Sequence, residues 1–593
     1  MKLGKYLLQS FIVSLFFVNT YSYAMDNLPQ DYKTEVKELL QKLTCEEKIG
    51  QLFMIATVVD PTDPRNARAL GMSINPTKSS PEFVHKLIKD YHVGGLIIQG
   101  RSDIKPVAEF IKAYQEFNKG HNKKIPLWFG QDLEWGLTMR IEDAVCFPKN
   151  MTLGAISDND LLYAMGKEIG RQCKQLGVHI NFAPVSDINS NPANPIIGDR
   201  SFGENKELVA QKAIAIMNGL QDTGIIACAK HFPGHGDTEK DSHLTLPMIS
   251  RTKEEIENVE LFPFKELIKA DVKSIMTAHF AVPALELKEN LPASLSHEIV
   301  TNLLRKQLNF KELVITDGLD MQGVCKDRED GYPELEALLA GNDLLLCPRH
   351  VPEAVNLIKD AINDGIISKA ELNKHVTKIL AAKEKIFEHQ QGFDDLENLQ
   401  NQLHTEEAYE LKRTLYREAI TLVCNDNNIL PLDSNKSVCC VQIGQTKSSP
   451  FGETLAKQFS IFLNTTLSSE ISDSDREHLL SQIKLDDTVV IGMVGMTRAA
   501  AQQYGVTESI KKTIRELKDH CNNVIVVLFG NPYSLKWFED IPAIIVAYED
   551  DPDAQIGAAE VISGALNPKG KLPVTASEKF PFELGLSYET IIS

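Results

Sequence analysis

The sequence predicts two α/β domains, the first a (β/α)8 barrel and the second an α/β sandwich. Three observations support this fold class. The chain has 593 residues, more than one hydrophobic core usually serves. Eight short apolar runs recur within the first 350 residues, with helix-like segments between most of them, and four similar runs follow residue 436. The composition, 43% apolar and 24% charged, is that of an ordinary globular protein.

The first eight runs have the composition of parallel strands. They are continuously apolar and rich in β-branched residues, as strands buried on both faces are. The intervening segments, such as residues 79–92 and 160–177, have helical periodicity. Eight such units favour a closed TIM-type barrel over an open sheet. In chain order the runs are IGQLFMIAT, VGGLIIQG, IPLWFGQD, VHINFAPVSD, IIACAKHF, KSIMTAHF, ELVITDGLD and NDLLLCP.

The remainder of the chain predicts two closing helices and then a second domain. Residues 353–387 form two helical patterns split at residues 363–365, and a polar stretch follows. The later runs SVCCVQIG, DTVVIGMVG, NVIVVLFGNP and AIIVAYEDD indicate an open, mostly parallel sheet. They contain no phosphate-binding glycine fingerprint. We therefore place the barrel at 25–390, a linker at 391–413 and the C-terminal α/β domain at 414–593.

The N-terminus has the pattern of a secretory signal peptide over residues 1–24. Lys2 and Lys5 precede an apolar run, and Ser22 and Ala24 occupy the small-residue positions of a cleavage site. A retained membrane anchor is the alternative, but the apolar run is short for a spanning helix. We expect an exported protein, periplasmic or secreted, without a stable membrane anchor.

Charge and cysteine spacing limit the partners and cofactors. The formal net charge of −19 disfavours nucleic acid and anionic membrane surfaces. The ten cysteines are scattered, without a C-x-x-C pair, so we expect buried free thiols rather than a zinc or redox motif. No cofactor is predicted.

Several of the first eight runs end in polar side chains, and in such barrels the active site lies at the C-terminal ends of the strands. Acids and bases there, without a cofactor motif, indicate hydrolysis. Glycoside cleavage requires one group at the anomeric carbon and another that protonates the leaving oxygen. The residues at these ends are Asp132, Asp187, Lys230 with His231, His279 and Asp317.

The candidate nucleophile is Asp317, which follows four apolar or β-branched residues and precedes Gly318. This position lies where a strand passes into a loop. Asp320 is the rival candidate. Alternatively, Asp317 only caps the helix that follows.

The candidate acid/base pair is Asp241 and His243, two residues apart in a segment rich in glycine and proline. The carboxylate can orient the ring and favour its protonated form, so the histidine can donate a proton and later take one from water. We expect a mobile loop that closes on substrate. Alternatively, the pair only braces the loop.

A metal site is the other interpretation of this segment. However, the H-x-x-x-H from His231 to His235 contains Pro-Gly, so its histidines cannot lie on one helical face, and no cysteine joins them. Hydrolysis requires no metal, and none is predicted.

At these residues the chain resembles glycoside hydrolase family 3, specifically its β-N-acetylglucosaminidase branch. KHFPGHGDTEKDSHLTLP closely resembles the long signature of that branch. NFAPVSDINSNPANPIIGDRSFG, SIMTAHFAVPAL and PASLS resemble its other blocks in the same order, over about residues 35 to 385. NPKGKLPVTASEKFPFELGLSY resembles the end of the second domain found in many members.

The resemblance implies a retaining exo-β-N-acetylglucosaminidase acting on glycans derived from peptidoglycan or chitin. Asp317 matches the nucleophile that forms a glycosyl-enzyme, and Asp241 with His243 matches the acid/base dyad. Asp132 matches the carboxylate that binds hydroxyls at the non-reducing end, which implies exo-cleavage. The other positions that match sugar contacts are Arg200, Lys230 and His231.

The chain departs from the branch at two places. Trp135 in DLEWGLTMR occupies a glycine position of D-Q-E-G-G-R-V, and TDGLDM replaces S-D-D-L-S-M. These differences bear on substrate preference more than on reaction type. The alternatives are a β-glucosidase or β-glycoside phosphorylase of the same family, and an inactive carbohydrate-binding protein, against which the intact Asp317, Asp241 and His243 argue.

The role of the second domain is a separate question. In the β-glucosidase branch that domain supplies a glutamate as acid/base, but here a dyad is present in the barrel. We therefore expect the second domain to be structural or to narrow the site. We expect residues 549–551, Glu-Asp-Asp, to be a solvated charge cluster, although they could reach the site from a strand end.

Overall fold

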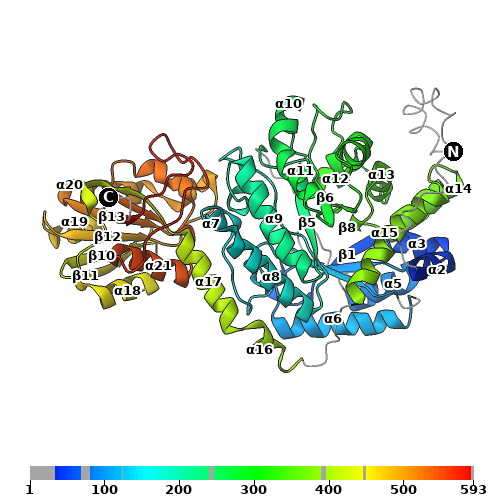
Figure 1. Ribbon diagram of the computed structural model, residues 1–593, viewed down its shortest axis with the longest axis horizontal. Coiled ribbons are helices and arrows are strands. Elements are labelled where there is room, and N and C mark those ends of the chain that lie inside the picture. Colours follow the sequence, from blue (N-terminus) through cyan, green and yellow to red (C-terminus); the bar gives the residue numbers. More distant parts are fainter. Residues whose placement is uncertain are drawn as a thin grey trace.

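The computed structural model shows two bodies side by side, a barrel and an open sheet, with a long helix between them (Figure 1). The predicted signal peptide and the pair Asp241 and His243 lie outside the residues that the structure describes. Those residues are 34–67, 80–122, 125–238, 246–326, 328–388, 396–444 and 449–588.

The first body is a barrel of eight parallel strands, so this fold prediction is confirmed. The strands pair in the order β7-β6-β5-β4-β3-β2-β1-β8, and a parallel bridge between Ile315 and Leu344 brings the two ends of the sheet together. Each strand lies within one of the eight predicted runs. Their bounds are β1 Phe53–Thr57, β2 Gly95–Ile98, β3 Trp128–Gln131, β4 Ile180–Asn181, β5 Ile226–Phe232, β6 Ser274–Thr277, β7 Leu313–Thr316 and β8 Leu345–Leu346.

Helices surround the barrel and begin at strong local signals. At the start of α5, Ser80 Oγ accepts a hydrogen bond from Phe83 N, and Ser368 with Glu371 forms a capping box at the start of α15. The helices are α2 Thr34–Lys42, α3 Cys45–Gly50, α5 Pro81–Tyr91, α6 Ile104–Lys119, α7 Asn150–Gly154, α8 Asn159–Leu176, α9 Lys206–Asp222, α10 Lys253–Glu255, α11 Phe262–Lys269, α12 Gln322–Cys325, α13 Tyr332–Ala340, α14 Val351–Asn363 and α15 Lys369–Phe387. Shorter 3-10 and π segments are η1 Pro64–Asn66, η3 Leu137–Met139, η4 Gly198–Arg200, η5 Ile256–Glu260, η6 Ala293–Leu295 and η7 Glu298–Gln307.

The second body is a six-stranded sheet in the order β11-β10-β12-β13-β14-β9, in which only β9 is antiparallel to its neighbour. The four predicted runs form β10, β12, β13 and β14. The strands are β9 Thr421–Asn425, β10 Ser437–Ile443, β11 Ser460–Leu467, β12 Thr488–Met493, β13 Asn523–Leu528 and β14 Ala543–Val546. The helical segments are η8 Asp426–Asn428, α18 Pro450–Gln458, α19 Asp473–Ser481, η9 Ala500–Gly505, α20 Glu508–His520, η10 Pro532–Trp537 and α21 Pro552–Ser563.

The connection between the bodies is largely helical. After α16, Leu399–Leu403, helix α17 runs from Glu406 to Ala419 and passes from the predicted linker into the second domain without a break. Lys412 on α17 forms ion pairs with Asp551 and Asp553 of the second domain, at 3.0 and 3.1 Å. The helix is therefore tied to the second domain.

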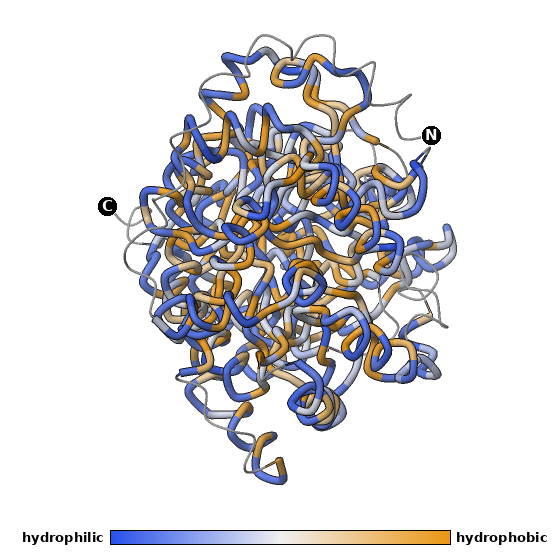
Figure 2. Tube along the Cα trace, turned by 90° about the vertical axis from the view of Figure 1, so that its right-hand side faces the viewer, coloured by the Kyte–Doolittle hydropathy of each residue, from blue (hydrophilic) through white to orange (hydrophobic). Residues whose placement is uncertain are grey.

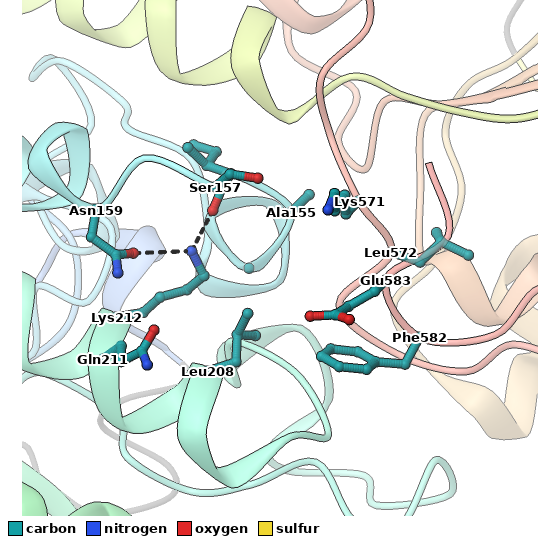
Figure 3. Close-up of a pocket in the computed structure, with 12 residues that line it drawn as sticks. Ala155, Ser157, Asn159, Leu208, Gln211, Lys212, Lys571, Leu572, Phe582 and Glu583 are labelled. Carbon is teal, nitrogen blue, oxygen red and sulfur yellow. Dashed lines mark hydrogen bonds between the residues drawn. The ribbon is translucent and has the colours of Figure 1, made fainter. Parts of the chain in front are cut away.

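A cavity of about 200 Å³ lies between the two bodies (Figure 3). Lys571 N donates to Ala155 O across this interface. On the barrel side, Lys212 Nζ donates to Ile156 O at 2.5 Å and to Asn159 Oδ1 at 3.3 Å. Because both acceptors are neutral, burial lowers the pKa of Lys212 to about 8.

Apolar residues gather in the interior and hydrophilic ones lie on the outside (Figure 2). All ten cysteines are free thiols and eight of them are buried, which confirms that prediction. Among the described helices, none is long and apolar enough to span a membrane.

Candidate active site

A buried cluster of charged side chains lies at the C-terminal ends of β3 and β5. Lys230, near the end of β5, is 2% exposed, and its Nζ lies 2.8 Å from Asp132 Oδ1 and 2.9 Å from Glu134 Oε1. Arg140 Nη2 donates to the other oxygen of Asp132 at 2.9 Å. Arg200 forms a two-point contact with Glu134 through Nε at 3.0 Å and Nη2 at 2.7 Å. Glu134 thus joins Arg200 to Lys230, and Lys230 joins both to Asp132, so three predicted sugar contacts lie in one cluster.

The fourth predicted sugar contact, His231, lies next to this cluster. Its Nδ1 is 2.7 Å from Asp187 Oδ2, and Arg200 Nη2 is 3.5 Å from its Nε2. Since a carboxylate only accepts hydrogen bonds, Nδ1 carries the proton in this contact. Asp187 therefore orients the ring, with Nε2 towards Arg200.

The cluster is ionised at neutral pH. Burial alone would raise the pKa of Glu134, but the charges of Arg200 and Lys230 lower it to about 2. For Asp132 the effect of burial is likewise outweighed, here by Lys230 and Arg140, so its pKa also falls. Burial opposes the charge of Lys230, yet Asp132 and Glu134 raise the pKa of this lysine. Fixed charges with their hydrogen bonds already oriented suit the hydroxyl groups of a sugar rather than an apolar ligand.

Asp317 follows β7 at the same end of the barrel, as predicted for the nucleophile. Its main-chain N donates to Thr277 O at 2.8 Å, and its Oδ1 accepts from Gly318 N at 2.8 Å. His279 Nε2, 2.9 Å from Gly318 O, donates to that carbonyl, which fixes the residue next to Asp317. The carboxylate is therefore presented by a rigid strand end.

The surroundings of Asp320, the rival nucleophile, oppose its ionisation. Its Oδ2 is buried without a hydrogen-bond partner. Burial, assisted by the charge of Asp317, raises its pKa to about 7. A carboxyl group that is protonated below neutral pH is a poor nucleophile, so Asp317 stays the candidate.

The predicted dyad, Asp241 and His243, lies outside the described residues, but the start of its loop is described. Asn194 Nδ2 donates to His235 O and Gly236 O, at 2.9 and 3.0 Å. A Cβ atom on Gly236 would lie 1.6 Å from Ile188 O, so only glycine fits there. Burial lowers the pKa of His235 to about 4, which keeps its ring neutral. The loop therefore leaves the barrel from a tightly packed base.

Comparison with known protein families identifies both bodies. Residues 44–382 match the model described as the glycosyl hydrolase family 3 N terminal domain, and residues 420–585 match the glycosyl hydrolase family 3 C-terminal domain. The chain belongs to glycosyl hydrolase family 3. The resemblance to this family is thereby confirmed, and the protein is an enzyme, a glycoside hydrolase.

Relatives within family 3 cover most of the chain. β-Hexosaminidase A of Pseudoalteromonas piscicida is 27% identical, over 84% of this chain and 91% of that protein. A β-N-acetylglucosaminidase/β-glucosidase of Cellulomonas fimi is 28% identical, over 68% of this chain and 69% of its own. The structure of a family 3 β-N-acetylglucosaminidase from Paenibacillus sp. str. FPU-7 has a TM-score of 0.72 and 29% identity, and covers 90% of this chain and 98% of its own. A β-glucoside phosphorylase, BglX, at 22% identity and a TM-score of 0.73, shows the fold alone.

Sequence reasoning missed two members of this family 3 site, Glu134 and Arg140. The side chain of Glu134 is 1% exposed and contacts both Lys230 and Arg200, and Arg140 contacts Asp132. Both lie in the segment DLEWGLTMR, where only Trp135 stood out as a departure from the family pattern. The available signal was an acidic residue shortly after the end of β3 and a basic residue at the end of the same segment.

The interpretation of residues 549–551 as solvated charges is wrong for Glu549. Its Oε1 accepts hydrogen bonds from Lys149 N at 2.8 Å and from Thr152 Oγ1 at 2.5 Å, both in the barrel. The preceding residue, Tyr548, has a φ of 64°, a left-handed conformation that redirects the chain after β14. Glu549 is thus part of the domain interface.

Proposed function

We propose that the protein is an exported retaining exo-β-N-acetylglucosaminidase that removes terminal GlcNAc from glycans derived from peptidoglycan or chitin. The observation that carries the proposal is the ionised cluster of Asp132, Glu134, Lys230 and Arg200 at the same end of the family 3 barrel as Asp317. The names of the relatives, a β-hexosaminidase and β-N-acetylglucosaminidases, support the sugar. The sequence pattern of residues 1–24 supports export.

In the first step, the proposed reaction forms a covalent intermediate. An Asp317 oxygen attacks the anomeric carbon while the protonated His243 donates its proton to the leaving oxygen, and the bond to that oxygen breaks. Asp241 stabilises the imidazolium. The sugar is then an ester of Asp317, and the aglycone departs as an alcohol.

In the second step, water displaces the Asp317 carboxylate from the anomeric carbon. His243, now neutral, takes a proton from water, whose oxygen attacks the same carbon and breaks the ester bond. Two inversions restore the β configuration, and Asp317 and His243 return to their starting states. Throughout, Asp132, Lys230 and Arg200 bind the hydroxyl groups of the terminal sugar. Asp132 at the non-reducing end leaves no room for a further sugar.

A β-glucosidase is the second candidate. Trp135 follows Glu134 in the sequence and occupies a position where the family branch has glycine. Its ring centroid lies 5.7 Å from Lys149 Nζ. A bulky ring in place of glycine, next to a member of the cluster, is the observation that favours a changed sugar preference. The Cellulomonas fimi relative carries both activities in its name.

Chromogenic substrates test the proposal. The p-nitrophenyl β-glycosides of GlcNAc and of glucose are each offered with and without phosphate, and product anomers are followed by NMR. We expect preference for the GlcNAc glycoside, no dependence on phosphate and β-GlcNAc as first product. Preference for the glucoside would replace the first candidate by the second. Phosphate-dependent turnover would indicate a phosphorylase, and binding without turnover a carbohydrate-binding protein.

A further inference from the structure

Glu549 brings the second domain into contact with the start of α7 in the barrel. The N-cap residue of α7, Lys149, provides no side-chain cap for the helix. Instead the Glu549 carboxylate accepts from Lys149 N and Thr152 Oγ1, although it lies 400 and 397 residues away in sequence. A carboxylate at a helix start satisfies a main-chain donor that has no partner within the helix. In Figure 1, α7 lies on the side of the barrel that faces the second domain.

The same turn of α7 contacts the segment that carries Arg200. Asn150 Nδ2 donates to the main-chain oxygen of Arg200 at 2.6 Å, and Lys149 Nζ forms an ion pair with Asp199 at 2.9 Å. Asn150 is 3% exposed, so its amide has little freedom to find another partner. The N-cap residue and the first residue of α7 therefore fix two successive residues of η4.

Arg200 links the position of η4 to the charge cluster of Glu134 and Lys230. Its guanidinium contacts Glu134 twice, at 3.0 and 2.7 Å, and Glu134 contacts Lys230. Two-point contacts of this kind depend strongly on geometry, because both hydrogen bonds must be satisfied together. A displacement of the Arg200 main chain would therefore misalign the cluster.

The chain conformation around Glu549 supports a specific role. Tyr548 takes a left-handed φ of 64° and its hydroxyl contacts Thr421 at 2.7 Å, so the turn that directs Glu549 to the barrel is held from within the second domain. Burial raises the pKa of Glu549. A solvated surface charge would have neither a raised pKa nor a fixed turn that directs it towards the barrel.

We propose that Glu549 is a positioning residue through which the second domain sets the place of Arg200 and thereby the affinity for the terminal sugar. The effect on affinity rests on the proposed function, whereas the effect on Arg200 does not. Glu549 touches no reacting atom. Its influence passes through Lys149, Asn150 and Thr152.

The test compares E549A with E549Q and with the control E204A. Glu204 is a carboxylate in the same interface and accepts hydrogen bonds from Thr575 N and Oγ1, at 2.9 and 2.7 Å. Among the described residues, its side chain forms no hydrogen bond or ion pair with α7. Hydrogen exchange of the peptide spanning residues 198–203 reports the position of η4 without any substrate. KM and kcat are measured with the glycoside that the wild type prefers, and thermal melting reports folding.

For E549A we expect faster exchange at residues 198–203 and a KM raised about tenfold with kcat changed less than about threefold. E549Q retains an acceptor oxygen and should stay within about threefold of the wild type in KM. E204A should leave both KM and the exchange of this peptide unchanged. In E549A combined with N150A, the two effects on KM should not add, because both act on one contact path.

Unchanged exchange at residues 198–203 in a folded E549A protein would overturn the proposal. So would an equal effect of E204A, which would show a general loss of the interface. If the wild type hydrolyses no glycoside, the proposed function fails, and the exchange measurement still decides the role of Glu549.

Discussion

Replacing Asp320 with asparagine tests whether the buried carboxyl group of this rival nucleophile keeps its proton. The ordinary pKa of an aspartate is 3.8, and burial raises that of Asp320 to about 7. Between about pH 4 and pH 7, the folded protein therefore keeps a proton on Asp320 that the unfolded chain has lost. Stability conferred by this proton falls as the pH rises through that range and is constant above it. The asparagine side chain of D320N has no such titration.

The magnitude follows from the two pKa values. One unit corresponds to about 1.4 kcal/mol, so between pH 5 and pH 8 the wild type should lose about 2–3 kcal/mol of stability relative to D320N. Comparing the two proteins at each pH cancels the titrations that they share.

Urea unfolding followed by tryptophan fluorescence measures this difference at pH 5 and pH 8; W537F in both proteins leaves only the signals of Trp128 and Trp135, both in the barrel. At pH 6 about nine tenths of Asp320 is protonated, so asparagine imitates it and kcat/KM should stay within about threefold of the wild type. D317N should lose at least about a thousandfold. A stability difference independent of pH, or an inactive D320N beside an active D317N, would refute the reasoning.

Three further predictions concern the acid/base pair, the charge cluster and metals. H243A should lower kcat/KM about 100-fold or more for a GlcNAc disaccharide but much less for the p-nitrophenyl glycoside, whose leaving oxygen needs no proton; equal losses would contradict the role of His243. E134Q leaves Lys230 and Arg200 buried without their shared anion, and breaking a buried ion pair costs about 3–5 kcal/mol. We therefore expect a lower melting temperature of the barrel and a loss of kcat/KM of about 100-fold or more. Unchanged melting would contradict the pairing. Dialysis against a chelator should leave activity intact, and a loss restored by zinc would show that a metal takes part.

The barrel was predictable because its strands are buried on both faces, so each strand corresponds to one apolar run in the sequence. The same signal found β10, β12, β13 and β14 in the second sheet. It missed β11 because that strand lies at the sheet edge, where exposed and partly buried residues alternate along Ser460–Leu467. It missed β9, Thr421–Asn425, which follows α17 directly and has no loop signal before it.

In the site, sequence located the strand ends but not the pairs that form there. Asp132, Lys230 and Asp317 each follow or finish a run, so their placement is local. The contact of Arg200 with Glu134 joins residues 66 apart, and that of Glu549 with Lys149 joins residues 400 apart. Such contacts depend on how the barrel loops and the second domain pack, which no single segment specifies.

The most direct test of the account is to identify the carboxylate that carries the sugar. The enzyme is incubated with a GlcNAc fluoride that bears a second fluorine at ring carbon 5, which slows release of the intermediate, and the labelled peptide is sequenced by mass spectrometry. We expect one sugar per chain, attached to Asp317. A label on Asp320, or steady turnover of GlcNAc glycosides with no trapped sugar on any carboxylate, would contradict it.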